Sequence, residues 1–351
     1  MEIKGKKVLV TGGAGFIGSN LVDELVKRGN QVVVLDDLSI GSRDNLKEAK
    51  SKGDVQLVEG SILDMNLVRK AMKDVNVVFH MAVQCLRLSF DKPMLVHEVN
   101  ATGTLNILRA AEEVMRESKN GFEKFAYVSS SEVYGTGIKV PMSEEHPLMP
   151  TTVYGASKLA GELYTDAFYR TYSLPTVVLR PFNTYGYREH FEGVHGEVIP
   201  RFLVRMLNGL PPVIFGDGSQ TRDFTFVTDT VDGLIRAASH DGFNGQSVNV
   251  ARGQEVTIKD IAEMMIEVLG FEDMKPSFGE DRPADVLRHY ADITKVSKAT
   301  GYKPSISIKE GLKLYIDWFK EQHPEPKKLL SECDAKNWVT EDAKVLSTTS
   351  N

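Results

Sequence analysis

The chain has 351 residues, of which 42% are hydrophobic and 26% charged, and its formal net charge is −6. This balance is typical of a globular protein with a sizeable core, and the lack of a long basic run argues against a nucleic-acid partner. We see no apolar run of about 18 residues and no charged-then-apolar leader, so we expect no membrane span and no signal peptide. We therefore expect a cytoplasmic protein in which Cys85 and Cys333, far apart and without metal-ligand spacing, are reduced thiols.

The first half of the chain alternates short apolar runs with segments of helical spacing. The run at 7–10 (Lys-Val-Leu-Val) precedes helical spacing over Phe16–Arg28, which stops at Gly29, a typical residue beyond a helix end. Further apolar runs predict buried parallel strands at Gln31–Leu35, Val55–Val58, Val77–Phe79, Phe125–Val128 and Thr176–Leu179. Such alternation builds βαβ units, so we expect an α/β fold with a Rossmann-like, doubly wound parallel sheet.

A glycine-rich loop (Gly-Gly-Ala-Gly-Phe-Ile-Gly at 12–18) lies between the first strand and the first helix. Glycine lets the backbone approach a pyrophosphate closely, and the helix N-terminus offers free N–H groups. Asp36, at the end of the second strand, would bind the adenosine ribose and repel a 2′-phosphate, which favours NAD over NADP, although Arg43 downstream could meet such a phosphate. Ser61 and Ile62 follow the third strand and either touch the adenine or form a plain turn. The predicted cofactor-binding residues of this region are Gly12, Gly15, Phe16, Ile17, Gly18, Asp36, Ser61 and Ile62.

Two polar segments point to proton transfer. The serine cluster Ser129–Glu132 follows the strand that ends at Val128, and the carboxyl ends of parallel strands face the ligand crevice. Tyr154 and Lys158 are four residues apart and share a helix face, so the ammonium would lower the phenol pKa from about 10. Such a phenol accepts the proton of a hydroxyl that is being oxidised. A serine turn and a chance surface pair are the plain alternatives, and the combination with the glycine loop favours the catalytic interpretation.

Beyond Arg180 the alternation becomes less regular. The segment 181–196 is rich in Asn, Tyr, Gly, His and charge, which predicts a functional loop. Later segments predict short strands at Val213–Phe215 and Phe224–Val227 and helices at Ile258–Leu269 and Ile308–Phe319. We expect a dinucleotide-binding domain with the catalytic residues over 1–180, mainly a substrate-binding lobe over 181–325 and a loosely ordered tail over 326–351.

Several motifs together resemble the extended short-chain dehydrogenase/reductases that act on nucleotide sugars. They are the glycine loop, Ser-Ser-Ser-Glu-Val-Tyr-Gly at 129–135, Val-Tyr-Gly-Ala-Ser-Lys at 153–158, Arg-Pro-Phe-Asn-Thr-Tyr-Gly at 180–186 and Gly-Asp-Gly-Ser-Gln-Thr-Arg-Asp-Phe at 216–224. The resemblance runs from about residue 5 to residue 320. It is very specific for the family and less so for one reaction.

The resemblance implies an enzyme that modifies a nucleoside-diphosphate sugar through a 4-keto intermediate, with tightly bound NAD that is recycled. Tyr154 would take the proton of the C4 hydroxyl, Ser130 matches the catalytic serine or threonine, and Lys158 would hold the nicotinamide ribose. Further matches are His80, Ala82 and Asn100 in the cofactor pocket and Asn183, Arg222 and Arg282 around the nucleotide diphosphate. A homodimer through the helix that carries Tyr154 is also implied.

Glu132 bears on the fate of the 4-keto intermediate. A 4-ketone acidifies the C5 proton, so a carboxylate beside the sugar could abstract it and expel the C6 hydroxyl. This makes a 4,6-dehydratase the first expectation. Family dehydratases usually carry Asp-Glu where this chain has Ser131 and Glu132, although Ser-Glu-Val-Tyr-Gly-Thr at 131–136, followed by Glu-His-Pro-Leu at 145–148, resembles a subgroup of amino-sugar 4,6-dehydratases with serine there. A 4-epimerase, which needs only Ser, Tyr and Lys, stays open as the alternative.

Other outcomes remain. A UDP-glucuronate decarboxylase is the third candidate, because such enzymes also carry Ser-Glu, and Glu132 could instead bond to the backbone. A dinucleotide-binding regulatory protein is the non-enzyme alternative, which the intact Ser130, Tyr154 and Lys158 disfavour. Cys85 lies in a loop that would reach the sugar; it resembles the cysteine of apiose-forming relatives, but a buried inert thiol is the better supported interpretation. Tyr187 replaces the usual proline of the family, which leaves the loop geometry and the identity of the sugar open.

Overall fold

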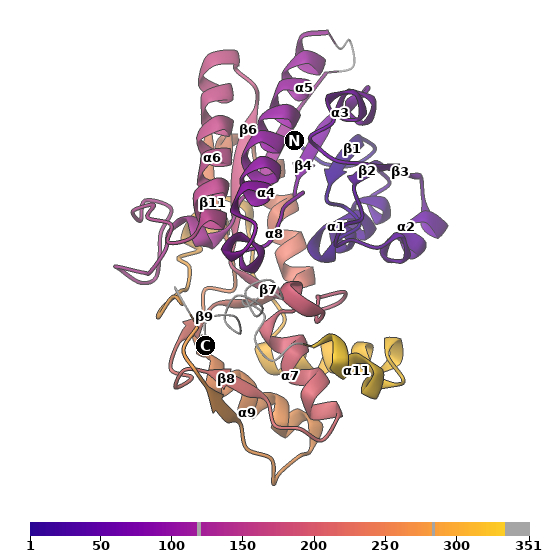
Figure 1. The fold of residues 1–351 in the computed structure, drawn as a ribbon. Helices are drawn as coiled ribbons and strands as arrows, with labels where there is room; N and C mark the ends of the chain where they lie inside the picture. The colour runs from indigo at the N-terminus through magenta and orange to yellow at the C-terminus, as the bar shows by residue number, and fades with distance from the viewer. Residues whose placement is uncertain (118–120, 283–284, 334–351) are drawn as a thin grey trace, which may run out of the picture.

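The computed structural model describes residues 1–117, 121–282 and 285–333, and its centre is a seven-stranded parallel sheet (Figure 1). The strand order is β11-β6-β5-β4-β1-β2-β3. The chain starts at β1, moves outward to β3 and then crosses to β4 on the other side of β1, which confirms the predicted doubly wound Rossmann-like sheet. The strands are β1 (Lys7–Thr11), β2 (Gln31–Asp36), β3 (Val55–Glu59), β4 (Val77–His80), β5 (Lys124–Val128), β6 (Thr176–Pro181) and β11 (Gln246–Val250).

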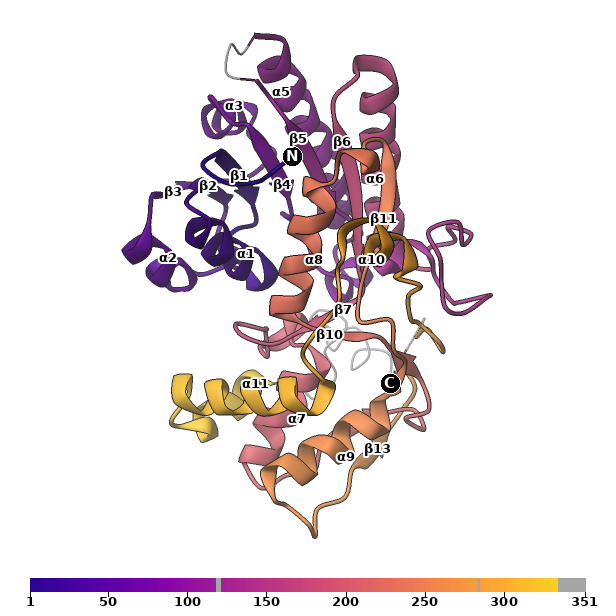
Figure 2. The same cartoon turned by 180° about the vertical axis from the view of Figure 1, so that it is seen from behind.

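Helices cover both faces of this sheet. Within β1, Val8 and Val10 belong to the apolar cluster on one face and Leu9 to the cluster on the other, as alternating strand side chains require. The first face is covered by α1 (Phe16–Lys27), α8 (Val227–Ser239) and α10 (Thr294–Thr300), and the second by α3 (Met65–Met72), α5 (Gly103–Glu117) and α6 (Val153–Tyr172). Figure 2 shows α8 on the first face of the sheet, with its lower end close to β10 (Phe224–Phe226). The short helix α2 (Lys47–Lys52) packs beside α1 at the edge of the molecule, and the short helix α4 (Pro93–His97) packs against α6 (Figure 1).

A smaller lobe lies beyond the carboxyl ends of the strands, below the sheet in Figure 1. Its own apolar cluster includes Tyr185, Phe224, Ile261 and Phe319. It contains α7 (Val198–Leu207), α9 (Ile258–Leu269), α11 (Ile308–Gln322) and the strand pairs β7 (Asn183–Tyr185) with β10 (Phe224–Phe226), β8 (Val213–Phe215) with β13 (Ser277–Gly279) and β9 (Thr221–Arg222) with β12 (Val256–Thr257). This lobe closes the crevice where doubly wound proteins bind ligands.

Part of the segment 181–325 returns to the sheet. The sequence did not predict β11, which pairs with β6 at the edge, nor α8, which starts at Val227 where a strand residue was expected. The β11 sequence (Gln-Ser-Val-Asn-Val) carries little apolar signal because only its two valines are apolar, and the buried Asn249 is satisfied by hydrogen bonds to Tyr134 and to the Met142 carbonyl. The division of the chain at residue 180 therefore stays a prediction, and the lobe consists of segments on either side of α8 and β11.

The expected loose tail is corrected over residues 326–333. Pro326–Glu332 forms a 3-10 helix that packs on α7, and Cys333 is buried in the lobe's apolar cluster. Packing of the partly buried Leu329 and Leu330 and of the buried Cys333 fixes a segment whose polar composition suggested disorder. Residues 334–351 lie outside the described residues. None of the helices in the described part of the chain combines the length and the apolar character that a membrane crossing requires.

Candidate active site

A continuous cavity of about 440 Å³ lies between the carboxyl end of the sheet and the lobe. It extends from the loop between β1 and α1, past the segment after β5, to β8 in the lobe. The predicted site residues that line it are Gly12, Gly15, Phe16, Ile17, Gly18, Asp36, Ser61, Ile62, Ala82, Cys85, Ser130, Ser131, Glu132, Tyr154, Lys158, Asn183, Arg222 and Arg282. The fold thus gathers most of the predicted cofactor, catalytic and substrate residues around one space.

The glycine loop at the start of the cavity has no room for side chains. Gly12 has a φ of +68°, and a Cβ there would lie 2.9 Å from the Ala82 backbone. A Cβ on Gly18 would lie 2.1 Å from the Gly12 carbonyl oxygen. Gly15 caps α1 without a side-chain hydrogen bond, so the first N–H groups of the helix face the cavity. This cradle fits the pyrophosphate of a dinucleotide.

Asp36 closes the adenosine end of the cavity. Its two carboxylate oxygens accept hydrogen bonds from the N–H groups of Ala14 and Leu38, each at 2.9 Å. Burial raises the Asp36 pKa, and these two bonds act against that rise. Arg43, the residue that could have met a 2′-phosphate, forms an ion pair with Glu59. The geometry favours NAD over NADP.

His80 and Asn100 do not line the cavity, contrary to the expectation. The His80 ring is bracketed by two hydroxyls, with Nδ1 2.6 Å from Thr11 Oγ1, and burial lowers its pKa to about 3. Asn100 binds the Gln84 backbone at both its N–H and its carbonyl and donates to Ser157 Oγ. Both residues are buried behind the lining and position it, because the strand end and the loop after β4 need internal hydrogen-bond partners.

Ser130 and Tyr154 form the hydroxyl pair of the site. Ser130 follows β5 and caps the 3-10 helix Ser131–Val133, and Tyr154 lies in the first turn of α6, which Thr152 caps. Ser130 Oγ accepts from the Glu132 N–H at 3.2 Å, and the Ser130 side chain lies close enough to the Tyr154 phenol to influence its pKa. Burial is the largest influence on the Tyr154 pKa and raises it above its usual value, while the Ser130 side chain lowers it. Burial thus acts against the lowering of this pKa that the sequence predicts, and the role of Tyr154 as base stays a prediction.

Lys158, the cation expected to lower this pKa, is bound elsewhere. Its Nζ donates to the Val128 carbonyl at 2.7 Å and lies 4.5 Å from the centre of the Tyr127 ring. Burial lowers the Lys158 pKa to about 7, and Glu162 acts in the opposite direction. In this structure the ammonium is bound to β5, so it does not lower the pKa of Tyr154.

At the lobe end, two arginines share one carboxylate. Arg222 Nη2 and Arg282 Nη2 lie 2.5 Å and 2.7 Å from the same Asp285 oxygen. Two guanidinium groups on one carboxylate leave a net positive charge beside the cavity. The buried Asn183 Oδ1 has no hydrogen-bond partner among the described residues. These groups fit a diphosphate and its neighbouring hydroxyls.

Glu132, Ser131 and Cys85 lie between these two ends. Burial raises the Glu132 pKa, and the charges of Arg222 and Arg282 act in the opposite direction. The Ser131 side chain is 5% exposed, and its carbonyl accepts from the His289 ring. Burial also raises the pKa of the Cys85 thiol, which disfavours the reactive thiolate.

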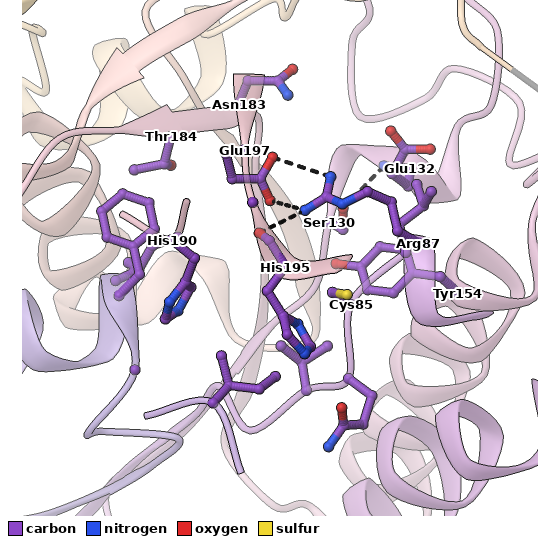
Figure 3. Close-up of a pocket in the computed structure, with 18 of the residues that line it drawn as sticks. Cys85, Arg87, Ser130, Glu132, Tyr154, Asn183, Thr184, His190, His195 and Glu197 are labelled. Carbon is purple, nitrogen blue, oxygen red and sulfur yellow. Dashed lines mark hydrogen bonds and ion pairs between the residues drawn. The ribbon is translucent and has the colours of Figure 1, made fainter. Parts of the chain in front are cut away.

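The sequence missed an ion pair that closes the sugar end of the cavity. Arg87 Nη2 lies 2.7 Å from Glu197 Oε1, and the same guanidinium donates to the carbonyls of Val194 (2.6 Å) and His195 (2.9 Å). Figure 3 shows this pair beside Cys85 and the Tyr154 phenol. The two charged residues lie in different loops and follow no motif spacing, so the sequence offered no signal for them.

Comparison with known proteins identifies the family. The family model described as GDP-mannose 4,6 dehydratase matches residues 9–315. The chain belongs to the NAD-dependent extended short-chain dehydrogenase/reductases, the nucleotide-sugar epimerases and dehydratases. This member is 36% identical over 319 residues to a UDP-glucose 4-epimerase of Mycolicibacterium smegmatis, a match that covers 90% of this chain and 99% of that one. It is 34% identical to a UDP-N-acetyl-alpha-D-glucosaminuronate decarboxylase of Bacillus cytotoxicus, covering 90% and 98%.

Solved structures of the family have the same fold. A UDP-N-acetylglucosamine 4-epimerase from Methanobrevibacter ruminantium, in complex with UDP-N-acetylmuramic acid, superposes with a TM-score of 0.84 at 34% identity, covering 91% of this chain and 99% of that one. A dTDP-glucose 4,6-dehydratase from Streptomyces venezuelae with NAD bound gives 0.83 at 29% identity, covering 91% and 99%. NAD is thus the cofactor of this family member, as predicted, and the glycine cradle and Asp36 fit it. The chain is an NAD-dependent enzyme of nucleotide-sugar modification.

Proposed function

We propose that the protein is a nucleoside-diphosphate-sugar 4-epimerase that works through a transient 4-keto sugar. The observation that carries this proposal is the set of side chains at the reacting centre. Ser130 and Tyr154 lie together there, and the position after Ser130 is a buried serine, Ser131. Epimerisation needs the hydroxyl site alone. Dehydration also needs an acid that protonates the departing C6 hydroxyl, and a serine is too weak an acid for that step. The epimerases among the similar proteins support the same choice.

The residues of the cavity have separate tasks in this reaction. NAD, when bound, supplies a hydride acceptor for the sugar C4 and a positively charged nicotinamide ring. Tyr154 would take the C4 hydroxyl proton, and the Ser130 hydroxyl would hydrogen-bond the same C4 oxygen. Arg222, Arg282 and Asn183 would hold the diphosphate while the 4-keto sugar rotates and presents its other face. Once the 4-keto sugar presents its other face, the hydride would return to C4 on that face and Tyr154 would return the proton to the C4 oxygen, which inverts C4.

A second candidate is 4,6-dehydration, favoured by the buried Glu132 carboxylate in the cavity. Its raised pKa suits a base that takes the C5 proton. In Figure 3, however, the Glu132 carboxylate points away from the Tyr154 phenol, to the other side of Arg87. This placement makes Glu132 a weaker basis for the reaction than the hydroxyl pair.

Product analysis tests the proposal. The purified protein is incubated with UDP-glucose, UDP-N-acetylglucosamine, dTDP-glucose, GDP-mannose and UDP-glucuronate, and products are followed by mass spectrometry and NMR. An unchanged mass with inverted C4 supports epimerisation, whereas loss of water supports dehydration and loss of carbon dioxide supports decarboxylation. Net accumulation of NADH would contradict all of these redox-neutral reactions.

The variant Glu132→Gln separates the two leading candidates. Epimerisation should slow by less than about tenfold, because the carboxylate takes no proton in that reaction, whereas a base in dehydration contributes about a hundredfold or more. The measurement is the turnover number on the best substrate, with the exposed Glu145→Gln of the following loop as the matched control. A loss above about a hundredfold in Glu132→Gln alone would favour the dehydratase.

The homodimer stays a prediction. Leu163 on α6 is 60% exposed and Leu105 on α5 is 39% exposed, which gives these two helices apolar surface. Leu159 and Phe168 of α6 instead pack on the core clusters. Light scattering of the purified protein tests whether two copies associate.

A further inference from the structure

One arginine joins two segments of the cavity wall. Arg87 comes from the loop after β4, and its guanidinium binds one short segment of the lobe. Nε donates to the Val194 carbonyl at 2.6 Å, Nη2 to the His195 carbonyl at 2.9 Å and to Glu197 Oε1 at 2.7 Å, and Nη1 to Glu197 Oε2 at 3.3 Å. The Arg87 side chain is 7% exposed, so the guanidinium itself is shielded from water. Figure 3 shows it reaching Glu197 and the His195 backbone beside the Tyr154 phenol.

The loop that carries Arg87 is fixed to the sheet. Two backbone N–H groups at its start donate to Thr11 Oγ1 at the end of β1, each at 3.1 Å. Asn100 Oδ1 accepts from the Gln84 N–H, and Asn100 Nδ2 donates to the Gln84 carbonyl. Arg87 therefore extends from a base whose backbone already has internal hydrogen-bond partners.

The segment that Arg87 binds is a closed loop of the lobe, here called the wall loop (residues 190–197). The Glu197 N–H donates to the His190 carbonyl at 2.8 Å, which joins the two ends of the loop just before α7. Phe191 of this loop is buried in the lobe's apolar cluster. Both ends of the wall loop line the cavity. Arg87 is thus a tie between this wall and the sheet, next to the reacting centre.

We infer that Arg87 is a positioning residue that keeps the wall loop closed and thereby retains the 4-keto sugar until it is reduced again. The inference rests on the proposed function and applies equally to epimerisation and 4,6-dehydration, because both pass through that ketone. While the ketone rotates it is held at its diphosphate, so closure of the wall around the sugar decides whether it reacts or leaves. A ketone that leaves lacks two hydrogen atoms, which stay with the protein as bound NADH and a proton.

Hydrogen–deuterium exchange tests the closure without any substrate. In the NAD-bound protein, Arg87→Met should speed exchange of peptides that contain 190–197 by at least about tenfold, because the lost charged hydrogen bonds raise the open population. Arg87→Lys keeps the charge but cannot span the separate acceptors, and should speed exchange by about threefold or more. The control is Arg69→Met, which breaks a two-bond pair with Glu113 between the outer helices α3 and α5. Wild-type exchange rates in either Arg87 variant would overturn the inference; circular dichroism and NAD content establish that each variant is folded.

The second measurement follows the ketone itself, with the substrate that product analysis identifies. In Arg87→Met, the fraction of turnovers that end in bound NADH and a free sugar lacking two hydrogen atoms should rise by at least about tenfold over wild type. Absorbance of the reduced nicotinamide and mass spectrometry read the two products. Faster exchange of the wall loop without released ketone would overturn the retention role. Lack of any sugar product from the wild type would contradict the proposed function and leave the exchange result standing.

Discussion

The cofactor end of the cavity is shaped by backbone, whereas its sugar end is held by side chains from separate loops. At the cofactor end, Gly12 and Gly18 leave no room for a Cβ, and Asp36 accepts from two backbone N–H groups. At the sugar end, Arg87 from the loop after β4 reaches across to Glu197 and to backbone carbonyls of the loop before α7. A ligand shared by a whole family is thus bound by local geometry, while the variable ligand is bound by contacts between distant segments.

The largest effect is expected where the two ends meet, at Tyr154. Tyr154→Phe should lower turnover by about a thousandfold, because general acid–base catalysis contributes about that much, while NAD stays bound. The measurement is single-turnover kinetics with NAD content determined in the same sample. Tyr169→Phe, a partly exposed tyrosine on the same helix, is the control. Unchanged turnover in Tyr154→Phe would refute the assignment of the base.

A test of the cofactor end compares two glycines of one loop. Gly18→Ala should weaken NAD binding by about a hundredfold, because its Cβ would lie 2.1 Å from the Gly12 carbonyl oxygen and the loop must shift. Gly15→Ala meets no protein atom closer than 3.4 Å, so it should leave the fold unchanged and weaken NAD binding only because its methyl group meets the pyrophosphate. Titration calorimetry with NAD measures binding by both variants, and thermal unfolding without NAD measures their stability. An unchanged melting temperature for Gly18→Ala would show that the backbone does not shape this end as tightly as the structure indicates.

Lys158 allows the same end to be probed by pH in the NAD-free protein. Burial lowers its folded pKa to about 7 from 10.5, so between these pH values the unfolded chain binds more protons than the folded one. The free energy of unfolding of the wild type should therefore rise with pH over this window relative to Lys158→Met, and the difference should level off below about pH 7. Urea unfolding of both proteins at several pH values checks this. If the free energy of unfolding of the wild type relative to Lys158→Met falls as pH rises, burial does not lower the pKa of Lys158.

The smallest effect is expected at the contacts between the loop that follows β7 and helix α1. Arg188 Nη1 lies 2.7 Å from Asp23 Oδ2 on α1, and Asn20 donates to the Tyr187 carbonyl. Arg188→Ala should raise the sugar KM by about threefold to tenfold with little change in NAD affinity, since a partly buried ion pair contributes about 1 kcal/mol. Arg170→Ala, in a surface pair on α6, is the control. An unchanged KM would show that the two ends are independent.

Much of the fold could be predicted because its signals are local. The apolar runs that became β1, β2, β4, β5 and β6 are almost fully buried, so each is readable without knowledge of its neighbours, whereas the edge strand β3 is fully buried only at Val58 and was read from its apolar residues alone. β11 was missed because an edge strand needs little apolar sequence, and its place depends on pairing with β6. His80 and Asn100 were placed in the lining from family positions, whereas internal hydrogen bonds hold them behind it.

Local sequence was enough to specify the parallel sheet, the glycine cradle and the hydroxyl and lysine residues of the site, because each depends on neighbouring residues and on the steric limits of the backbone. Only the packing of the whole chain decided three features of the site: the raised pKa of Tyr154, the hydrogen bond of Lys158 to β5, and the Arg87–Glu197 ion pair. These features depend on burial and on the distance between charges from remote segments. Burial and the distances between charges are fixed when the chain packs, and the spacing of residues along the sequence does not determine them.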